Sequence, residues 1–596
     1  MFDTVLVANR GEIALRVMRA CRELNLKAIA VYSEVDRDAP HVAYADDAYL
    51  IGPSPASESY LNIERILAVA RQSGAGAIHP GYGFLSENAN FARAVADTGL
   101  IFVGPPPDAT EALGGKVAAR NVARKVGVPM VPGTLKPLES VEEAVQLAQE
   151  FGYPVAIKAV AGGGGRGLRV VRSEDEIEAA FESARREAEI SFGNGELYIE
   201  KFLDNPRHIE IQILADNHGN VVYVGERDCS IQRRHQKLIE ESPSPVITPE
   251  QRAEIGAAAV RLPKEVGYSG AGTLEFLYQD GQFYFLEMNS RIQVEHTVTE
   301  MVYGIDLVKG QLRVAQGEPL WFTQEDIVPR GHSIECRITA EDTLANFRPA
   351  IGTIGNYREP TGLGVRVDSG VRAGWTIPQH YDSLLSKLIT WGQDRDEAIS
   401  RMLRVLNDYV IEGVTTTIPF FKAALEHPVF LAGEATVNFI PDHPELFERI
   451  KELAGPSHVI MPTETEEDLI RSFNVEVNSR LFQVRVAEVG GPPMVVRAGG
   501  SASRGPARKS KAVRTDGAKA MAAPSNGVIS PLQGVVGAIR TEPGATVEAD
   551  QVIFVIQAMK MENEITSPKA GKIGEIRVEV GASVEAGAVL ATYAEE

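Results

Sequence analysis

The sequence predicts a multidomain α/β protein that ends in a small all-β domain. The chain has 596 residues, enough for several domains of roughly 100–200 residues each. Strand-like and helix-like runs alternate through residues 1–450, a pattern typical of α/β folds. Near the C-terminal end, one segment rich in strand-forming residues occurs twice.

The composition argues against several classes of protein. Hydrophobic residues make up 44% of the chain and charged residues 23%, as in ordinary soluble globular proteins. The net charge of −20 disfavours general binding to nucleic acid or to an anionic membrane surface, although a local basic cluster can still bind an anionic substrate. No apolar run reaches about 18 residues, and the first residues read as a strand, so we expect neither a membrane span nor a signal peptide.

The three cysteines, Cys21, Cys229 and Cys336, lie far apart and form no CxxC pair. Their spacing suggests neither a disulfide framework nor a zinc site. A reducing compartment fits this usage, and we expect a cytoplasmic protein.

The first 105 residues show the α/β alternation clearly. Residues 4–32, TVLVANRGEIALRVMRACRELNLKAIAVY, read as a strand, a glycine turn, an amphipathic helix and a second strand, which is a βαβ unit. Its one glycine, Gly11, is too weak a signal for a dinucleotide-binding loop, which needs three. Residues 76–105 continue the same pattern.

A glycine-rich segment, YPVAIKAVAGGGGRGLRVV, occupies residues 153–171. Lys158 ends an apolar strand, the run Gly162–Gly165 follows, and a second strand comes after it. The backbone N–H groups of such a loop can approach a polyphosphate closely, although a strand follows where a Walker A loop has a helix. A mobile hairpin without a ligand is the alternative. Four successive glycines cost much backbone entropy, so we favour a phosphate lid, which Lys116 and Lys201 would suit.

The most informative stretch is GTLEFLYQDGQFYFLEMNSRIQVEHTVTEM, residues 272–301. Asp280-Gly281 is a strong signal for a hairpin turn between two strands. Glu275 and Glu287 lie at equal distances from its glycine, so they should face each other across the hairpin, with Asn289 on the same face as Glu287. These three residues supply the hard oxygen ligands that Mg²⁺ with nucleotide phosphates requires.

The alternation continues beyond the hairpin and places Arg291, Gln293 and Glu295 on the same face. That edge would then carry metal ligands, an arginine for an anion, an amide and a carboxylate base. Any one of these residues could belong to a solvated strand face. Six polar residues in strict alternation beside an aromatic strand make that reading weak.

Two further segments carry residues suited to the same site. Residues 200–214 and 225–243 contribute Glu200, Lys201, His208, Gln232, Arg233, Arg234, His235 and Lys237. A basic cluster in a chain of net charge −20 points to an anionic ligand. A lone histidine such as His208 more often has a structural role. A functional role for His208 is supported only by the charged residues near it.

Residues 530–556 and 567–593 form the internal repeat. They align at a constant offset of 37 with 13 identities over 27 positions. Each copy alternates apolar with small or polar residues and is broken by Gly-Ala, which indicates short strands and turns. Two such copies predict a small all-β sandwich with pseudo-twofold symmetry.

Lys560 stands between Met559 and Met561, in the segment that joins the two copies. In a duplicated β fold this segment would be a hairpin tip, where an accessory group can be attached and swung. An ordinary surface lysine is the alternative, but it leaves the flanking methionines unexplained.

Residues 497–526 are rich in Gly, Ala, Ser, Pro and basic residues, and few of them could build a core. They read as a flexible tether, which suits a carrier that travels between two sites; a basic interaction patch is the alternative. Upstream, residues 472–489 alternate and read as a hairpin with its turn at Asn478-Ser479, a small β element that would dock a neighbour.

Four motifs together resemble those of biotin carboxylases of the ATP-grasp superfamily: HPGYGFLSEN, KAVAGGGGRG, ERDCSIQRRHQK and EMNSRIQVEHTVTE. The resemblance covers roughly the first 450 residues. Met-Lys-Met at the junction of the β repeat resembles the attachment site of biotinyl carrier domains, whereas lipoyl domains, their near relatives, usually have Asp-Lys-Ala there. Gln557 stands where that family usually has Glu. The whole chain is similar to the α subunit of an acyl-CoA carboxylase.

The resemblance implies a fold and a domain order. We expect a Rossmann-like pre-ATP-grasp domain, an ATP-grasp domain and an α+β C-terminal biotin carboxylase domain, followed by a biotinyl domain in the form of a hammerhead or flattened barrel. The expected boundaries are 1–114, 115–330 and 331–450 for the three biotin carboxylase domains, 451–496 for the small β docking element, 497–526 for the linker and 527–596 for the carrier domain.

The resemblance also implies a role for each site residue. ATP would be bound by Lys116, Lys158, Gly162, Gly163, Gly164, Gly165, Glu200, Lys201, Leu203, His208, Gln232 and His235. Glu275, Glu287 and Asn289 would bind Mg²⁺ or Mn²⁺. Bicarbonate would be held by Lys237, Arg291, Gln293 and the backbone of Val294, with Glu295 as the base that deprotonates it and Arg337 stabilising the biotin enolate. Biotin would be attached covalently to Lys560.

These roles imply ATP- and bicarbonate-dependent carboxylation of biotin. The chain has no room for a carboxyltransferase, so we expect a complex with a separate β subunit, and a biotin protein ligase that loads Lys560. Acetyl-CoA and propionyl-CoA are the leading acceptors. A subunit of a split pyruvate carboxylase is one alternative, although in those the biotinyl domain usually lies on the other chain. A non-enzymatic biotin or lipoyl carrier is another, and the intact set of charged site residues argues against it.

Overall fold

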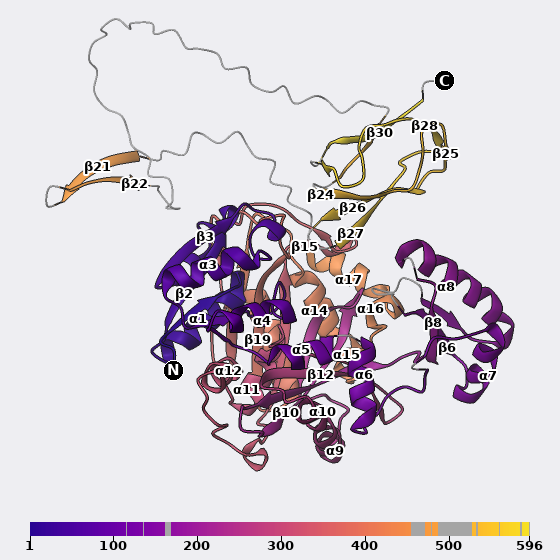
Figure 1. Ribbon diagram of the computed structural model, residues 1–596. Helices are drawn as coiled ribbons and strands as arrows, with labels where there is room; N and C mark the ends of the chain where they lie inside the picture. The colour runs from indigo at the N-terminus through magenta and orange to yellow at the C-terminus, as the bar shows by residue number, and fades with distance from the viewer. Residues whose placement is uncertain are drawn as a thin grey trace, which may run out of the picture.

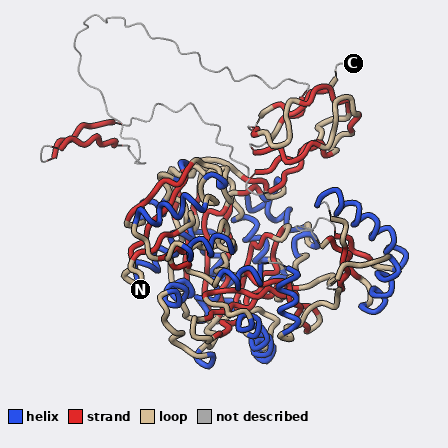
Figure 2. The backbone as a smooth tube through the Cα atoms, in the orientation of Figure 1, coloured by secondary structure: helices blue, strands red, loops and turns tan. Residues whose placement is uncertain are grey.

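The computed structural model describes residues 1–114, 116–134, 136–160, 168–192, 194–454, 471–477, 480–486, 527–531, 534–558, 561–584 and 587–594 (Figures 1 and 2). An α/β body extends to residue 454, a short hairpin follows, and an all-β domain ends the chain. The predicted order of an α/β part followed by an all-β part is confirmed. Within the described part, none of the helices combines the length and apolar character that crossing a membrane demands.

A five-stranded parallel sheet, ordered β3-β2-β1-β4-β5, forms the N-terminal part of the body. Its strands are β1 (Thr4–Val7), β2 (Lys27–Ser33), β3 (Asp47–Gly52), β4 (Ala77–His79) and β5 (Ile101–Phe102). The predicted βαβ unit is confirmed, because β1 and β2 pair in parallel and α1 (Gly11–Glu23) connects them. With α2 (Pro40–Tyr44), α3 (Ile63–Ser73) and α4 (Ala89–Asp97), α1 covers both faces of the sheet, as a parallel sheet requires.

An eight-stranded antiparallel sheet forms the centre of the body, in the order β13-β12-β9-β10-β11-β14-β19-β18. Its strands are β9 (Arg207–Ala215), β10 (Val221–Arg233), β11 (Gln236–Ser242), β12 (Gly270–Gln279), β13 (Gln282–Asn289), β14 (His332–Thr339), β18 (Val365–Ser369) and β19 (Leu384–Gly392). Because β11 pairs directly with β14, segments far apart in the sequence share one sheet. The candidate site lies along this sheet.

Helices enclose the central sheet. On the side of β9, β12 and β13, the core is shared with α5 (Pro107–Gly114), α6 (Lys116–Lys125), α9 (Pro249–Ala259) and α10 (Arg261–Glu265). Next to the N-terminal part lie α11 (His296–Tyr303) and α12 (Leu307–Ala315). The core around β11, β14 and β19 includes α13 (Arg395–Asp408), α14 (Ile418–Glu426), α15 (Pro428–Leu431), α16 (Phe439–Asp442) and α17 (Glu445–Ala454).

Several of these helices begin at residues that cap them. Thr248 and Gln251 form a capping box at α9, in which each side chain accepts a hydrogen bond from the other's backbone N–H. Asp394 caps α13 by accepting from the N–H of Glu397. Two-stranded ladders complete this region: β15 (Glu341–Asp342) with β16 (Arg348–Pro349), and β17 (Tyr357–Arg358) with β20 (Val410–Ile411).

A small unit with its own core projects from the body at the right of Figure 1. It contains the sheet β7-β6-β8, with β6 (Val155–Ala159), β7 (Leu168–Val171) and β8 (Leu197–Lys201), and the helices α7 (Val141–Phe151) and α8 (Ile177–Phe192). The predicted pair of strands around the glycine-rich segment is confirmed, because Lys158 on β6 pairs with Leu168 on β7. Residues 161–167, which include that segment's glycines, lie outside the described residues.

The C-terminal domain consists of two four-stranded sheets, β23-β30-β28-β25 and β27-β26-β24-β29. Its strands are β23 (Gly527–Ile529), β24 (Gly534–Ile539), β25 (Thr546–Val547), β26 (Val552–Ala558), β27 (Met561–Thr566), β28 (Gly571–Ile576), β29 (Ser583–Val584) and β30 (Val589–Tyr593). Strands that start 37 residues apart, such as β24 and β28, hold equivalent positions in the two sheets. The repeat therefore produces the predicted all-β sandwich with pseudo-twofold symmetry.

Two hairpins of this region match the sequence reading. β26 and β27 pair as far as Ala558 and Met561, so these two strands form a hairpin at the junction between the two copies of the repeat. Met559 and Lys560, between those strands in the sequence, lie outside the described residues. Upstream, β21 (Arg471–Val477) pairs with β22 (Arg480–Val486), as predicted, and its expected turn at 478–479 also lies outside the described residues.

Candidate active site

The hairpin β12–β13 supplies the acidic part of the site. Asp280 and Gly281 have φ angles of 52° and 78°, as the favoured two-residue hairpin turn requires. Glu275 pairs directly with Glu287, which confirms the predicted pairing. Asn289 ends β13, and its Nδ2 donates a hydrogen bond of 2.8 Å to Glu275 Oε1.

The predicted strict alternation beyond Asn289 is wrong. β13 ends at that residue, and residues 290–295 form bends and a turn that lead into α11. The chain turns because Ile292 is fully buried in the core between the N-terminal part and the central sheet. Gln293 and Glu295 nevertheless reach the site from this loop, and both are buried.

Lys237 on β11 joins the carboxylates of the site. Its Nζ donates hydrogen bonds to Glu275 Oε1 at 2.9 Å and to Glu295 Oε1 at 2.8 Å, and it also pairs with Glu210 of β9. Three carboxylates around one ammonium repel each other, so the arrangement needs further positive charge. Arg227 of β10, which is fully buried, supplies it by donating to Glu210 Oε2 at 3.0 Å.

These contacts set the ionisation of the site. Burial alone would lower the pKa of Lys237, but the carboxylates of Glu210, Glu295 and Glu275 raise it well above its ordinary value. Burial and the Glu210 carboxylate would raise the pKa of Glu295, but Lys237 and Arg337 bring it below its ordinary value. Glu295 is therefore ionised at neutral pH, the state in which a carboxylate can accept a proton.

His208 of β9 faces the same hairpin. Its Nε2 lies 3.1 Å from Glu275 Oε2. Burial would lower the pKa of His208, but Glu275 raises it to about 9, so the ring is cationic at neutral pH. Burial would likewise raise the pKa of Glu275, and Lys237 and His208 bring it well below its ordinary value. Glu275 is thus ionised and flanked by cations.

Arg337 of β14 holds the other oxygen of Glu295. It donates to Glu295 Oε2 at 2.9 Å and to Glu240 Oε1 at 2.6 Å. Glu240 is fully buried, and burial raises its pKa to about 7 despite Arg337. Both oxygens of Glu295 therefore accept a hydrogen bond from a cation, one from Lys237 and one from Arg337.

Arg291 lies at the other edge of the site. Its NH2 donates to Asn289 Oδ1 at 2.8 Å, and its Nε donates to Glu87 Oε2 at 2.9 Å. Glu87 also accepts from the backbone N–H of Ser290 at 3.1 Å. Glu87 therefore links the N-terminal part of the body to the loop that carries Arg291.

Sequence reasoning missed four of these residues: Glu87, Glu210, Arg227 and Glu240. One signal for Glu210 was available, because strand alternation places it on the same face as His208 and Gln212. Glu87 and Arg227 lie within the motifs HPGYGFLSEN and ERDCSIQRRHQK, but their partners in the fold, like that of Glu240, are remote in sequence, so local spacing assigns them no role.

Of the residues predicted to bind nucleotide from the small unit, Lys158 and Glu200 contact each other, and Lys201 contacts two backbone carbonyls. Lys158 forms an ion pair with Glu200, which also accepts a hydrogen bond of 2.7 Å from Arg120 of α6. Lys201 Nζ donates to two backbone carbonyls at the end of α7, those of residues 152 and 153, both at 2.9 Å. Leu203 is buried just beyond β8. Lys158 and Glu200 therefore lie on one face of the small sheet, and Lys201, which pairs with Val155, lies on the other.

Gln232 and His235 lie near the turn between β10 and β11. Gln232 is buried and pairs across the ladder with Lys237. His235 is exposed in the two-residue turn, where it and Arg234 have φ angles of 66° and 49°. Non-glycine residues held with positive φ store strain that often marks a functional loop. The Lys116 side chain, Gly162–Gly165 and Lys560 lie outside what the structure describes.

The donor set suits a hard divalent cation. Glu275 and Glu287 face each other, and Asn289 is hydrogen-bonded to Glu275. His208, Glu210 and Glu275 also bring one ligand atom each to within 4.8 Å of one another. Carboxylate and amide oxygens are the ligands that Mg²⁺ prefers, usually together with substrate phosphates.

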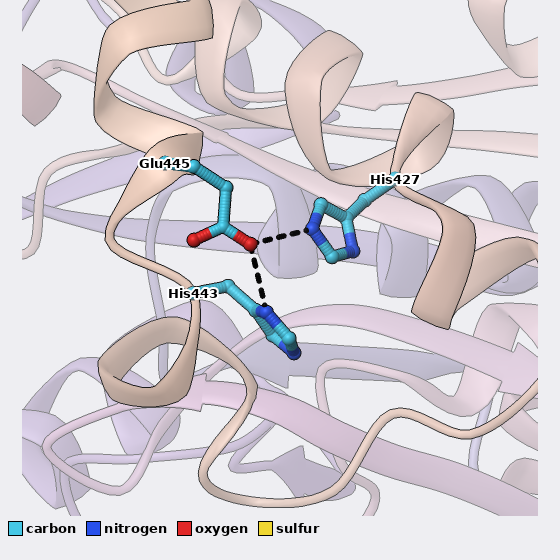
Figure 3. Close-up of side chains that lie close together, drawn as sticks. All are labelled: His427, His443 and Glu445. Carbon is cyan, nitrogen blue, oxygen red and sulfur yellow. Dashed lines mark hydrogen bonds and ion pairs between the residues drawn. The ribbon is translucent and has the colours of Figure 1, made fainter.

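A second group of histidines and a glutamate lies away from this site (Figure 3). Nε2 of His427 lies 3.2 Å and Nδ1 of His443 lies 3.0 Å from Glu445 Oε1. His427 Nδ1 accepts the backbone N–H of Val429 at the start of α15, so its Nε2 carries the proton and donates to Glu445. The group therefore links the starts of α15 and α17, and its facing nitrogens serve as hydrogen-bond donors.

Comparisons with family models divide the chain into four matches. Residues 1–110 match the N-terminal domain of biotin carboxylase, residues 115–323 the ATP-binding domain of the carbamoyl-phosphate synthase L chain, and residues 335–442 the biotin carboxylase C-terminal domain. Residues 519–593 match the family model of biotin-requiring enzymes.

Curated relatives extend over most of the body. The chain is 55% identical over 443 residues to a pyruvate carboxylase subunit of Methanothermobacter thermautotrophicus, a match that covers 74% of this chain and 90% of that protein. It is 54% identical over 442 residues to biotin carboxylase 1 of Bacillus subtilis, covering 74% of this chain and 98% of the relative.

Solved structures show the same architecture. The biotin carboxylase domain of Hydrogenobacter thermophilus 2-oxoglutarate carboxylase, in complex with MgADP and bicarbonate, matches with a TM-score of 0.70 and 50% identity over 75% of this chain and 99% of that domain. The biotin carboxylase subunit of a pyruvate carboxylase matches with a TM-score of 0.69 and 50% identity over 75% of this chain and 99% of that structure.

Proposed function

Because this chain belongs to the biotin carboxylase family and carries a biotinyl domain, we propose that its ATP-dependent carboxylation of biotin serves an acyl-CoA acceptor through a separate carboxyltransferase subunit. The observation that carries the proposal is the fusion itself. One chain holds both a complete biotin carboxylase body and a carrier domain, which follow each other in the sequence with the β21–β22 hairpin and the expected linker, residues 497–526, between them.

We assign the first chemical step to Glu295 and the cations around it. Bicarbonate is held by Lys237, Arg291, Gln293 and the backbone of Val294. Glu295 removes its proton, and the resulting oxygen attacks the γ-phosphate of ATP while the bond to the leaving ADP breaks, giving carboxyphosphate. A carboxylate base within hydrogen-bond reach of its substrate is the usual arrangement for such a proton transfer.

The remaining assignments follow the chemistry of phosphoryl transfer. Glu275, Glu287 and Asn289 would hold Mg²⁺ or Mn²⁺, which when bound neutralises charge on the phosphates. The nucleotide would be bound by Lys116, Lys158, Gly162–Gly165, Glu200, Lys201, Leu203, His208, Gln232 and His235. Carboxyphosphate would break down to CO₂ and phosphate, and the phosphate would take the N1 proton of the biotin on Lys560. Arg337 would stabilise the resulting enolate as it captures CO₂. The small unit around β6 would shield carboxyphosphate from water.

The choice of acceptor rests on the carrier domain. The match to the Methanothermobacter pyruvate carboxylase protein covers 443 residues of this chain and 90% of that protein. The remaining tenth of that protein is too short to include a carrier domain of the size found here. Acetyl-CoA and propionyl-CoA are therefore our first candidates. A 2-oxo acid is the second candidate, because solved structures of similar fold include biotin carboxylase parts of 2-oxoglutarate and pyruvate carboxylases.

The complex captured through its biotin tests the proposal. Fixation of labelled bicarbonate would be measured with ATP and Mg²⁺ onto acetyl-CoA, propionyl-CoA, a long-chain acyl-CoA, pyruvate and 2-oxoglutarate in parallel. Label in a CoA thioester supports the proposal and identifies the acceptor. Label in pyruvate or 2-oxoglutarate alone would replace it with the second candidate.

A further inference from the structure

Three consecutive residues of the loop before α11 are each held by a buried or half-buried cation. The hydrogen bonds run from Arg227 to Gln293 Oε1 (2.6 Å), from Lys387 to the Val294 carbonyl (2.8 Å) and from Arg337 to Glu295 Oε2 (2.9 Å). The cations come from β10, β19 and β14. Lys387 differs from the two arginines because it reaches the loop through the backbone.

Lys387 is an unusual residue for its place in the fold. It lies in the middle of β19 with 0% of its surface exposed, opposite Arg337 of β14 and Asp368 of β18. Its Nζ is 3.4 Å from Glu12 Oε1 of α1. A fully buried lysine is costly unless its charge is paired, and here the charge is shared between carboxylates and one carbonyl of the active-site loop.

Holding this carbonyl orients the loop. No strand pairing fixes residues 290–295, and the first backbone hydrogen bonds of α11 hold only the end of the loop, through the carbonyls of Gln293 and Glu295. The Gln293 carbonyl accepts from His296 Nδ1 at 2.7 Å, and the Val294 carbonyl accepts from Lys387. Because each peptide group is planar, fixing these two carbonyls also fixes the directions of the N–H groups of Val294 and Glu295.

We propose that Lys387 is a positioning residue for bicarbonate, which acts by holding the Val294 carbonyl. The inference rests on the proposed function, in which Gln293 and the Val294 backbone hold bicarbonate and Glu295 deprotonates it. Without Lys387, the peptide between Val294 and Glu295 can rotate, and the loop loses the geometry that binds bicarbonate. The nucleotide residues of the small unit lie on other elements and keep their positions.

A merely structural role makes a different prediction. Lys387 also neutralises Glu12 and Asp368, so its removal destabilises the buried charges whatever the loop does. Asp368→Asn disturbs the same group of charges, since Asp368 pairs with Arg366 at 2.7 Å, but it does not touch the loop. Comparing the two variants separates positioning from stability.

The test uses bicarbonate-dependent ATP hydrolysis by the full-length chain with free biotin. Lys387→Met should raise the KM for bicarbonate roughly tenfold, the effect of losing one hydrogen bond from a charged donor, and leave the KM for ATP within about twofold. Asp368→Asn should lower thermal stability with both KM values near those of the parent. Lys387→Arg, which keeps a cationic donor, should restore most of the bicarbonate affinity.

Either of two results with folded Lys387→Met would overturn the inference: an unchanged KM for bicarbonate, or equal increases in the KM for bicarbonate and for ATP. If that variant does not fold, the double variant Lys387→Met with Asp368→Asn decides by the same ratio, because it removes the contact with the Val294 carbonyl together with one of the carboxylates that Lys387 faces. A parent chain without bicarbonate-dependent ATP hydrolysis would instead count against the proposed function.

Discussion

At the scale of single residues, the site depends on one carboxylate held on both sides. Glu295 accepts from Lys237 through Oε1 and from Arg337 through Oε2. Each oxygen keeps a second lone pair, so the carboxylate can be oriented by cations and still accept a proton. The same cations keep its pKa below the ordinary value in spite of its burial.

Glu295→Gln tests this role. The amide keeps the size of the side chain and cannot act as a base, so carboxylation of free biotin should fall by roughly 10²–10⁴-fold. Steady-state assays with free biotin measure the loss, and binding of a non-hydrolysable ATP analogue, which should be unchanged, is the control. Activity within tenfold of the parent would remove the assignment of Glu295 as the base.

The low pKa of Glu241 predicts that the stability of the protein depends on pH. Glu241 is buried, lies 2.7 Å from both His332 Nε2 and Arg395 Nε, and has a pKa of about 2, because these partners outweigh the effect of burial. A carboxyl group whose pKa falls from about 4.5 to about 2 on folding stabilises the protein above pH 4.5 by about 3 kcal/mol, and this contribution is lost as the pH falls towards 2.

Unfolding midpoints of the parent and of Glu241→Gln between pH 2 and pH 7 check the prediction. The parent should be more stable near neutral pH, and the difference should shrink between about pH 4.5 and about pH 2. A difference that stays constant over this range would contradict the assigned cause.

At the scale of elements, the hairpin was predictable and the loop after it was not. Asp280-Gly281 fixes a two-residue turn, and the pairing of Glu275 with Glu287 follows from counting residues. Beyond Asn289 the same count fails, because burial of Ile292 and the start of α11 turn the chain. An alternating pattern does not reveal where tertiary packing ends a strand.

The cap at Thr248 predicts how much one side chain contributes to the start of α9. Thr248 is exposed, and its contribution is the capping box at α9, so Thr248→Ala should destabilise the start of that helix by about 1 kcal/mol. Hydrogen exchange should then be faster at residues 250–252, while Thr248→Ser, which keeps the capping oxygen, should exchange like the parent. Equal exchange in the parent and Thr248→Ala would show that the cap contributes nothing.

At the scale of the whole molecule, the body and the carrier are separate folded units with separate cores. The repeat of 37 residues made the carrier's symmetry predictable, because each copy builds equivalent strands of two sheets. The buried charges of Arg227 and Lys387 were not predictable, because their partners come from strands and loops brought together only by the central sheet. A flexible tether would let the carrier reach both the body and a partner enzyme.

Lys560→Arg allows the activities of the body and of the carrier to be tested separately. The variant keeps the positive charge and cannot be biotinylated, so the body should carboxylate free biotin at the rate of the parent. Transfer of CO₂ to any acceptor should stop, because no carrier brings the group to the carboxyltransferase. Parallel assays with free biotin and with the complete complex measure both activities, and transfer that survives the substitution would remove the carrier role.

The most direct test of the account is to follow label onto the carrier itself. The biotinylated chain would be incubated with ATP, Mg²⁺ and labelled bicarbonate without an acceptor, and the peptide that contains Lys560 would then be isolated at alkaline pH and analysed by mass spectrometry. We predict that this peptide gains the mass of one CO₂ in the parent and not in Glu295→Gln. A biotinylated Lys560 peptide that gains no label in the parent, while ATP is hydrolysed, would contradict the account.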